Sequence, residues 1–211
     1  DPRHNAFLGH ADMTLWLATE GSRVVGRIAA IDDRLHNDVH GESITWFGFF
    51  EAESAAIGGA LLRAVETHAQ HRGSTAVRGP VNPSLHEAAG VLVEGFDDDP
   101  YALMAYNPPT YQAFVEGAGY ARVKDLYSWA LDLRQPLPDR ITKIAARVRD
   151  RYGITIRPVD LSRFDAELEI LKVVYRAAWA DNWGFVPPTD DEIRQLAVEL
   201  KPVADPELVL F

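Results

Sequence analysis

The order of strand-like and helix-like runs near the start of the chain restricts its fold more than any other feature. Runs rich in β-branched and aromatic residues lie at 14–18, 23–31 and 42–51. Turn-forming residues at 19–22 join the first two runs into a hairpin. From about Ser54, apolar residues recur with a helical period that stops at Gly73. This order predicts an α/β fold with a mixed sheet that is flanked by helices.

The remainder of the chain continues this alternation. We expect a strand at 75–81, a helix at 83–93, a strand at 102–106, a helix at 108–118 and a strand at 126–133. The string QPLP at 135–138 then interrupts the pattern, as a linker does. Further elements are predicted as helices at 139–151, 164–178 and 189–200, and as a strand at 154–159. We therefore predict a first domain in residues 1–134 and the beginning of a second domain in residues 135–211.

The two ends of the chain carry strand patterns. The apolar run at 208–211 is typical of a buried strand, and no partner strand follows it. A buried strand needs neighbours on its sheet. A hairpin also begins almost at once at the other end. We therefore expect both domains to be incomplete, with the chain a fragment of a longer protein.

Charge and composition exclude several classes of protein. Lys and Arg total 21 against 31 Asp and Glu, and this net charge of -10 makes nucleic acid a poor partner. There is no cysteine, which excludes thiolate metal sites, disulfides and a cysteine nucleophile, and which fits a cytoplasmic protein. No apolar run approaches the roughly 20 residues of a membrane-spanning helix, so only peripheral contact with a membrane stays open.

The basic residues gather mildly in one predicted helix. They are Arg140, Lys143, Arg147, Arg149 and Arg151. These residues recur with helical spacing beside apolar ones such as Ile144 and Val148. We interpret this helix as having a solvated basic face.

Several short strings resemble a known family. They are RGPVNPS at 78–84, EGFD at 94–97, YNPP at 106–109, GY at 119–120, KDLY at 124–127 and NWGFVP at 182–187. Together they resemble a bacterial family of tandem GNAT-like proteins that is similar to the bacterial ceramide synthases. The likeness covers essentially the whole chain. It implies the GNAT fold and direct transfer of an acyl group from acyl-CoA, or a related thioester, to an amine such as a long-chain base.

The resemblance implies a pyrophosphate site where the helix after residue 53 begins, because a helix N-terminus favours anions. Its cofactor-binding positions are Ala56, Gly58 and Gly59. Ala56 stands where the family pattern has glycine, and Glu53 adds a carboxylate that would repel a phosphate. We therefore expect poor CoA binding by the first domain, with a second domain supplying the acyl-CoA.

The resemblance also implies a tyrosine that protonates the departing thiolate. The aligned residue is Val115, which has no proton to donate. Tyr111 lies one helical turn earlier and is the only nearby substitute. The general base is expected where the central strand ends, at Glu51. Solvated carboxylates at a strand end are the alternative for Glu51 and its neighbour Glu53.

Four further residues are candidates for the site. Asn82 and Ser84 follow the strand at 75–81, where we expect it to diverge from the strand that ends at Glu51. They are predicted to bind substrate, and a helix cap is the alternative. His86 could act as a base at neutral pH, with an ordinary surface histidine as the alternative. Trp183 could line an acyl groove, or it could anchor a loop to the core.

A metal site is not expected. His36 and His40 have a spacing that would fit a metal on a helix, but no Cys or HExxH pattern supports one. We interpret this stretch as a polar loop.

The sequence is compatible with three functions to different degrees. An N-acyltransferase, acting on a small-molecule amine and an acyl thioester, is the leading prediction. The alternative is a non-catalytic GNAT-like module for ligand binding or interaction, which Glu53 and Val115 favour for the first domain alone. An aminoacyl-tRNA-dependent transferase is opposed by the net charge of -10.

Overall fold

The computed structural model describes residues 5–132 and 134–211. Internal contacts divide the chain into two compact units. Unit 1 comprises Asp1–Asp125 and Trp179–Pro188, and unit 2 comprises Leu126–Ala178 and Thr189–Phe211. We call Trp179–Pro188 the return segment, because through it the chain comes back to unit 1 for a few residues. The division into a first domain at 1–134 and a second from 135 stays a prediction.

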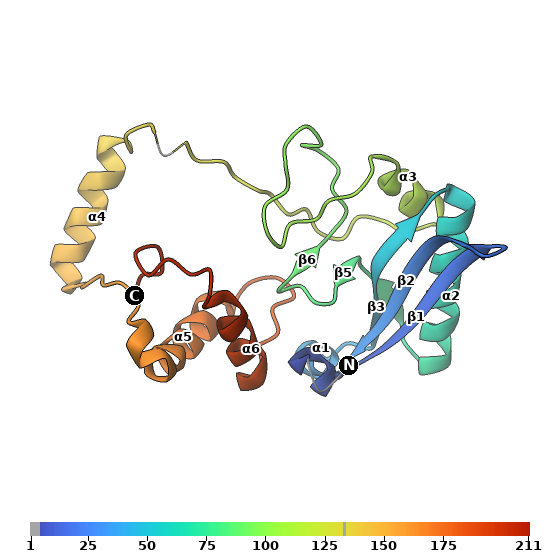
Figure 1. Cartoon of the computed structure of the whole chain (residues 1–211), viewed down its shortest axis with the longest axis horizontal. Coiled ribbons are helices and arrows are strands. Elements are labelled where there is room, and N and C mark those ends of the chain that lie inside the picture. The colour runs from blue at the N-terminus through green and yellow to red at the C-terminus, as the bar shows by residue number, and fades with distance from the viewer. Residues whose placement is uncertain (1–4, 133) are drawn as a thin grey trace. The chain divides into compact units, whose positions relative to one another are not determined.

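Unit 1 is built on a four-stranded sheet with the order β1-β2-β3-β4 (Figure 1). Its strands are β1 (Ala11–Glu20), β2 (Arg23–Asp33), β3 (Ile44–Ala52) and β4 (Ala76–Arg78). The first three are antiparallel, and β4 is parallel to β3. The predicted mixed α/β sheet is confirmed. Pairing of β3 with β4 ends at Trp46 and Arg78, where β4 itself ends, while β3 continues to Ala52. The expected divergence of the two strands stays a prediction.

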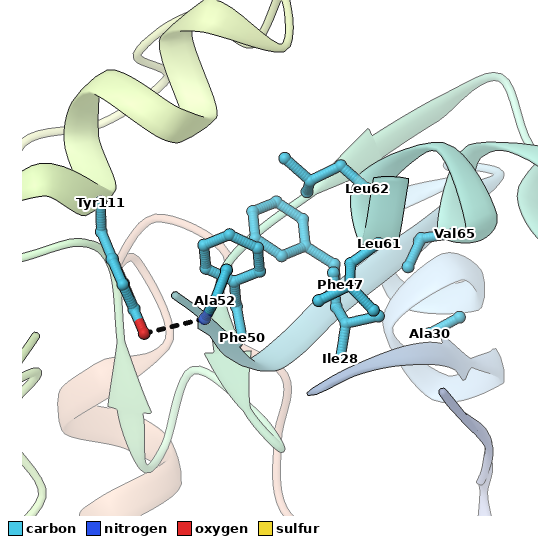
Figure 2. Close-up of a cluster of buried hydrophobic side chains, with 9 residues drawn as sticks. All are labelled: Ile28, Ala30, Phe47, Phe50, Ala52, Leu61, Leu62, Val65 and Tyr111. Carbon is cyan, nitrogen blue, oxygen red and sulfur yellow. Dashed lines mark hydrogen bonds between the residues drawn. The ribbon is translucent and has the colours of Figure 1, made fainter. Parts of the chain in front are cut away.

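Helix α2 (Ala55–Arg72) covers one face of this sheet. It begins at the Ser54 cap and ends at Gly73, which has a left-handed φ of 75° that glycine adopts without strain. Figure 2 shows the core between helix and sheet, where Leu61, Leu62 and Val65 of α2 meet strand residues such as Phe47. Each such side chain stabilises the fold by about 1.5–3 kcal/mol when it is fully buried.

The opposite face of the sheet is covered too. Along β2, Ile28 and Ala30 face α2, whereas Ala29 and Ile31 belong to a second core with Phe7. Phe7 comes from the short helix η1 (Ala6–Gly9). Strand β2 is therefore buried on both sides, with the period of two that a strand imposes. On the edge strand β1, Leu15 and Leu17 stay exposed.

The chain after β4 departs from the predicted helix at 83–93. It forms a two-stranded ribbon of β5 (Val81–Asn82) and β6 (Ala88–Ala89) instead. The backbone at Val81 crosses β3 so closely that a Cβ on Gly48 would collide with the Val81 carbonyl oxygen. This close crossing is a tertiary contact, and a local helical pattern cannot report it.

The polar stretch before β3 is helix α1 (Arg34–His40), which corrects the predicted loop. Asp33 caps its start by accepting the His36 N–H, and Gly41 ends it with a left-handed φ of 61°. A cap and a glycine stop thus enclose a short helix despite its polar composition.

Helix α3 (Thr110–Gly117) confirms the predicted helix at 108–118. The predicted strands at 102–106 and 126–133 are not strands in the described residues, and residue 133 lies outside them. Side chains at 126–132 are exposed, Trp129 among them at 89%. Without a neighbouring strand to pair with, a β-rich run has no ladder of hydrogen bonds.

In its described residues unit 2 contains three α-helices, the last residue of α5 excepted, and all three were predicted. They are α4 (Asp139–Tyr152), α5 (Phe164–Trp179) and α6 (Asp190–Leu200), with a short helix η2 (Leu161–Arg163) before α5. The apolar run at 208–211, after which no partner strand was found in the sequence, pairs antiparallel with the earlier segment at 157–159. The N–H groups of Arg157 and Phe211 each donate to the other's carbonyl at 2.9 Å.

Candidate functional site

An irregularity in β3 shapes the end of this strand. The register with β2 runs from Arg27 opposite Glu51 to Ala29 opposite Gly48, so β3 carries one extra residue. Phe49 lies there with a φ of 51°. Its N–H donates to Oδ1 of Asn82 at 2.6 Å. Asn82, predicted to bind substrate, therefore satisfies the backbone of a β-bulge and fixes the direction in which β3 continues.

Two of the predicted catalytic residues meet just beyond this bulge. The Tyr111 hydroxyl donates to Oε2 of Glu51 at 2.9 Å and accepts the Ala52 N–H at 3.0 Å, drawn as a dashed line in Figure 2. The Tyr111 ring lies buried against Phe50, with centroids 5.2 Å apart. Burial raises the pKa of the Tyr111 hydroxyl, so it keeps its proton at neutral pH.

Glu51 combines this fixed hydrogen bond with access to solvent. Its side chain is 56% exposed, and its Oε1 lies 3.6 Å from Nη2 of Arg27 on β2. The buried tyrosine therefore holds one carboxylate oxygen, while the group as a whole stays open to a reactant. This is the geometry expected of a proton acceptor at a surface site.

A pocket of about 250 Å³ lies at the start of α2, against α3. Its lining is made mostly of small side chains: Ala55, Ala56, Gly59, Arg63, Ala113, Phe114, Gly117 and Ala118. The structure thus places the predicted Ala56 and Gly59 together in one pocket. Gly58 instead packs inward, where an added Cβ would lie 3.1 Å from the Phe50 ring.

The charges around this pocket are less unfavourable to a phosphate than the sequence suggested. Glu53 forms a two-pronged ion pair with Nη1 of Arg23, at 2.7 Å to each oxygen, so its charge is offset. Arg63 lines the pocket, and within the described part of the chain it has no carboxylate at ion-pair distance. Sequence reasoning missed Arg63, although its spacing of four residues from Gly59 places both on one helix face.

His86 binds the return segment, and Ser84 supports His86. Nε2 of His86 donates to the Val186 carbonyl at 2.7 Å, which fixes a proton on that nitrogen because a carbonyl only accepts. The His86 ring lies edge-on to Phe185. Ser84 Oγ in turn accepts the His86 N–H at 3.2 Å. In the described structure, His86 thus positions the return segment, and Ser84 positions the backbone of His86.

Trp183 of the return segment stacks on an arginine. The Arg78 guanidinium lies 5.6 Å from the Trp183 ring and 5.3 Å from the Trp46 ring. Arg78 also donates to both oxygens of Glu42 at 3.1 Å. The arrangement corresponds to a loop anchor, the alternative considered for Trp183.

His36 and His40, the residues with metal-like spacing, use their ring nitrogens within unit 1. Nε2 of His36 bonds Glu42 at 3.0 Å, and Nε2 of His40 donates to the Phe185 carbonyl at 3.1 Å. Burial lowers the pKa of His36, which favours the neutral ring. Across residues 5–132 and 134–211, no three His, Asp or Glu side chains converge as a metal ligand set.

Two known proteins match most of this chain. A protein named bacterial ceramide synthase, from Caulobacter vibrioides (strain NA1000 / CB15N), is 41% identical over 215 residues, which cover 100% of the chain and 55% of that protein. Protein YghO of Escherichia coli (strain K12) is 31% identical over 202 residues, 95% of the chain and 51% of that protein. These relatives support a bacterial ceramide-synthase-like family. The chain spans about half the length of the curated relatives it matches.

No family model matches the chain, and no solved structure does. The comparison bears out the resemblance to bacterial ceramide synthases and leaves the GNAT assignment unconfirmed. In this chain, which is similar to a bacterial ceramide synthase, the informative geometry is the hydrogen bond between Glu51 and Tyr111. An exposed carboxylate there can take a proton, and a protonated phenol can give one.

Proposed function

We propose that this chain belongs to an N-acyltransferase that moves an acyl group from acyl-CoA, or a related thioester, to an amine of the long-chain-base type. The name of the Caulobacter relative, bacterial ceramide synthase, supports an acyltransferase-type activity. The hydrogen bond between Tyr111 and Glu51 is the observation that carries the proposal. A GNAT-like first domain, with a second beginning near residue 135, is part of the same proposal.

On the amine side, Glu51 acts as the general base. The amine nitrogen attacks the thioester carbonyl carbon, a C–N bond forms, and the C–S bond breaks. The proton that the nitrogen loses goes to the Glu51 carboxylate. This role requires a carboxylate within reach of a reactant, which the 56% exposure of Glu51 provides.

On the thioester side, Tyr111 replaces the acid that Val115 cannot supply. Its hydroxyl proton passes to the departing thiolate, and the proton gained by Glu51 returns to the Tyr111 oxygen along their 2.9 Å hydrogen bond. The raised pKa of Tyr111 keeps the hydroxyl protonated until the thiolate forms. The amine thus loses one proton and the thiol gains one, which balances the reaction.

The pocket at the start of α2 is proposed to hold a phosphate of the acyl carrier. The first turn of a helix presents N–H groups that lack intrahelical partners, and the macrodipole favours an anion there. Arg63 adds a positive charge to the lining. Two features were expected to weaken phosphate binding here, the Glu53 carboxylate and Ala56 in place of glycine. Pairing with Arg23 offsets the charge of Glu53, whereas Ala56 remains.

The alternative of a non-catalytic module predicts that ligands bind without reaction. The comparison with a ceramide synthase does not favour it. Kinetics separate the two proposals, because only the acyltransferase releases free thiol in step with amide formation.

The test is an acyl-transfer assay with the full-length protein, a long-chain acyl-CoA and either a long-chain base or a short polar amine. Glu51→Gln should lower the rate at least about tenfold, the smaller end of what a general base contributes. Glu53→Gln is the matched control, because it makes the same chemical change two residues away, and we expect a rate within about twofold of the unmodified enzyme. Full activity of Glu51→Gln, or the absence of amide with every amine, would refute the proposal.

A further inference from the structure

Helix α4 of unit 2 has a regular apolar stripe that no other described part of the chain covers. None of its 14 residues is buried. The large apolar side chains recur at intervals of three, four and four residues and keep a substantial exposed fraction: Ile141 51%, Ile144 47%, Val148 40% and Tyr152 67%. This spacing places them on one side of the helix.

The charge of α4 contrasts with that of the chain. The helix contains five basic and two acidic residues, whereas the chain has a net charge of -10. Positive charge is thus concentrated in one exposed helix of an acidic protein. Such a concentration of positive charge favours binding of an anionic partner.

The basic residues of α4 fall into two sets. Lys143 and Arg149 have acidic neighbours, with Nζ of Lys143 3.9 Å from Asp139 and Nε of Arg149 3.6 Å from Asp150. The second set has no carboxylate at ion-pair distance in the described parts of the chain: Arg140, Arg147 and Arg151.

The second set also has a definite position. At 3.6 residues per turn, Arg140, Arg147 and Arg151 form one row along the helix. This row borders the apolar stripe on the side of Ile144. Asp139 and Asp150 fall on the opposite side of α4 from the stripe. The helix therefore presents apolar and unpaired cationic groups in one direction and its carboxylates in the other.

We propose that α4 docks on the surface of a bilayer that contains anionic lipids. The apolar stripe would enter the headgroup boundary while the row of arginines contacts lipid phosphates. A nucleic acid would use the arginines but not the stripe, so it fits the helix less well. Among the described residues no helix has the length and hydropathy to cross a membrane, so the proposed contact lies in the plane of the interface. This inference does not depend on the proposed acyl transfer.

The experiment is co-flotation of the full-length protein with vesicles of phosphatidylcholine alone, or of phosphatidylcholine mixed with phosphatidylglycerol. We expect binding to the mixed vesicles and a loss of binding as salt is raised. Each unpaired arginine should contribute about fivefold to the partition coefficient. Arg140→Gln with Arg147→Gln should therefore weaken binding by about 25-fold.

A matched control removes the same charge from the same helix. Lys143→Gln with Arg149→Gln takes away the two cations that already have acidic neighbours, and should weaken binding by less than the first pair. Ile144→Gln with Val148→Gln tests the stripe and should also weaken binding, while far-UV circular dichroism reports whether α4 still forms. Equal binding to both kinds of vesicle, equal losses in the two charge pairs, or binding to a duplex DNA instead of vesicles would overturn the proposal.

Discussion

The two units bury different kinds of side chain. In unit 1, large apolar residues such as Ile28, Phe47, Leu62 and Val65 are almost wholly buried between the sheet and α2. In the helices α4, α5 and α6, the buried apolar residues are Leu168 and Ile193, and Glu167 and Lys172 are buried with them. Unit 1 is thus held by a buried apolar core, whereas unit 2 relies more on polar interactions.

The buried charged side chains of unit 2 form ion pairs. Glu167 accepts two hydrogen bonds from Arg157, at 2.8 and 3.0 Å, and this guanidinium lowers the pKa of the Glu167 carboxyl. Lys172 donates to Glu169 at 2.8 Å and to Asp190 at 3.1 Å. Such pairs fix the ends and spacing of helices but supply less stability than an apolar core.

Phe47→Ala should have the largest effect, because it removes a ring from the centre of unit 1. We expect the free energy of unfolding to fall by about 3–5 kcal/mol, as for other buried aromatic residues. Ile144→Ala in α4 removes an exposed side chain and should change it by no more than about 0.5 kcal/mol. Urea denaturation measures both. Equal losses would show that the two units do not differ as described.

Asn82→Ala tests whether this side chain supports the β3 bulge. It leaves the N–H of Phe49 without its acceptor, which should cost about 1–3 kcal/mol of unfolding free energy. Asn82→Asp retains an oxygen at the same position and should lose less. If both variants unfold at the same urea concentration as the unmodified chain, Asn82 is free for substrate, as the sequence predicted.

Thr189→Ala addresses a local interaction of unit 2. Thr189 and Glu192 form a reciprocal capping box at the start of α6. Its loss should cost about 1 kcal/mol. Thr142→Ala in α4 is the control, because the Thr142 hydroxyl bonds a carbonyl of its own helix, to Asp139. Thermal melting followed by circular dichroism at 222 nm (a wavelength typical for helices) should show a lower midpoint for Thr189→Ala alone; indistinguishable midpoints would contradict the assigned cap.

The smallest expected effect is a dependence of unit 1 on pH. Burial lowers the pKa of His36 in the folded state below that in the unfolded chain. The unfolded state then binds more protons as pH falls below about 6.5, so stability is present above that pH and is lost as pH decreases. Unfolding measured between pH 7 and pH 5 should show a shallower slope for His36→Gln. An unchanged slope would mean that another group is responsible.

The contrast between the units also explains what could be predicted from the sequence. The helix at 139–151 was found from its periodicity, and the helix at 189–200 from its Thr189 capping box, because both signals are local. The ribbon of β5 and β6 was missed because it depends on Gly48 meeting Val81 across the sheet. Helix α1 was missed because its polar residues hide the Asp33 cap and the Gly41 stop.

In the candidate site, too, local features were predictable and tertiary contacts were not. Glu51 and Tyr111 were named from the sequence, but their hydrogen bond depends on how α3 packs against β3. Pairing of Glu53 with Arg23 joins two strand ends that are distant in sequence, so its charge appeared to be an obstacle. Individual residue types were predictable here, and their partners were not.

The central claim is that Glu51 and Tyr111 of unit 1 act together in acyl transfer. A double-mutant cycle on the rate of amide formation by the full-length protein tests it most directly, with Glu51→Gln, Tyr111→Phe and the two combined. Because the residues share one proton path, we expect the double variant to be about as slow as the slower single variant. Losses that simply multiply, or single variants with full activity, would contradict the claim.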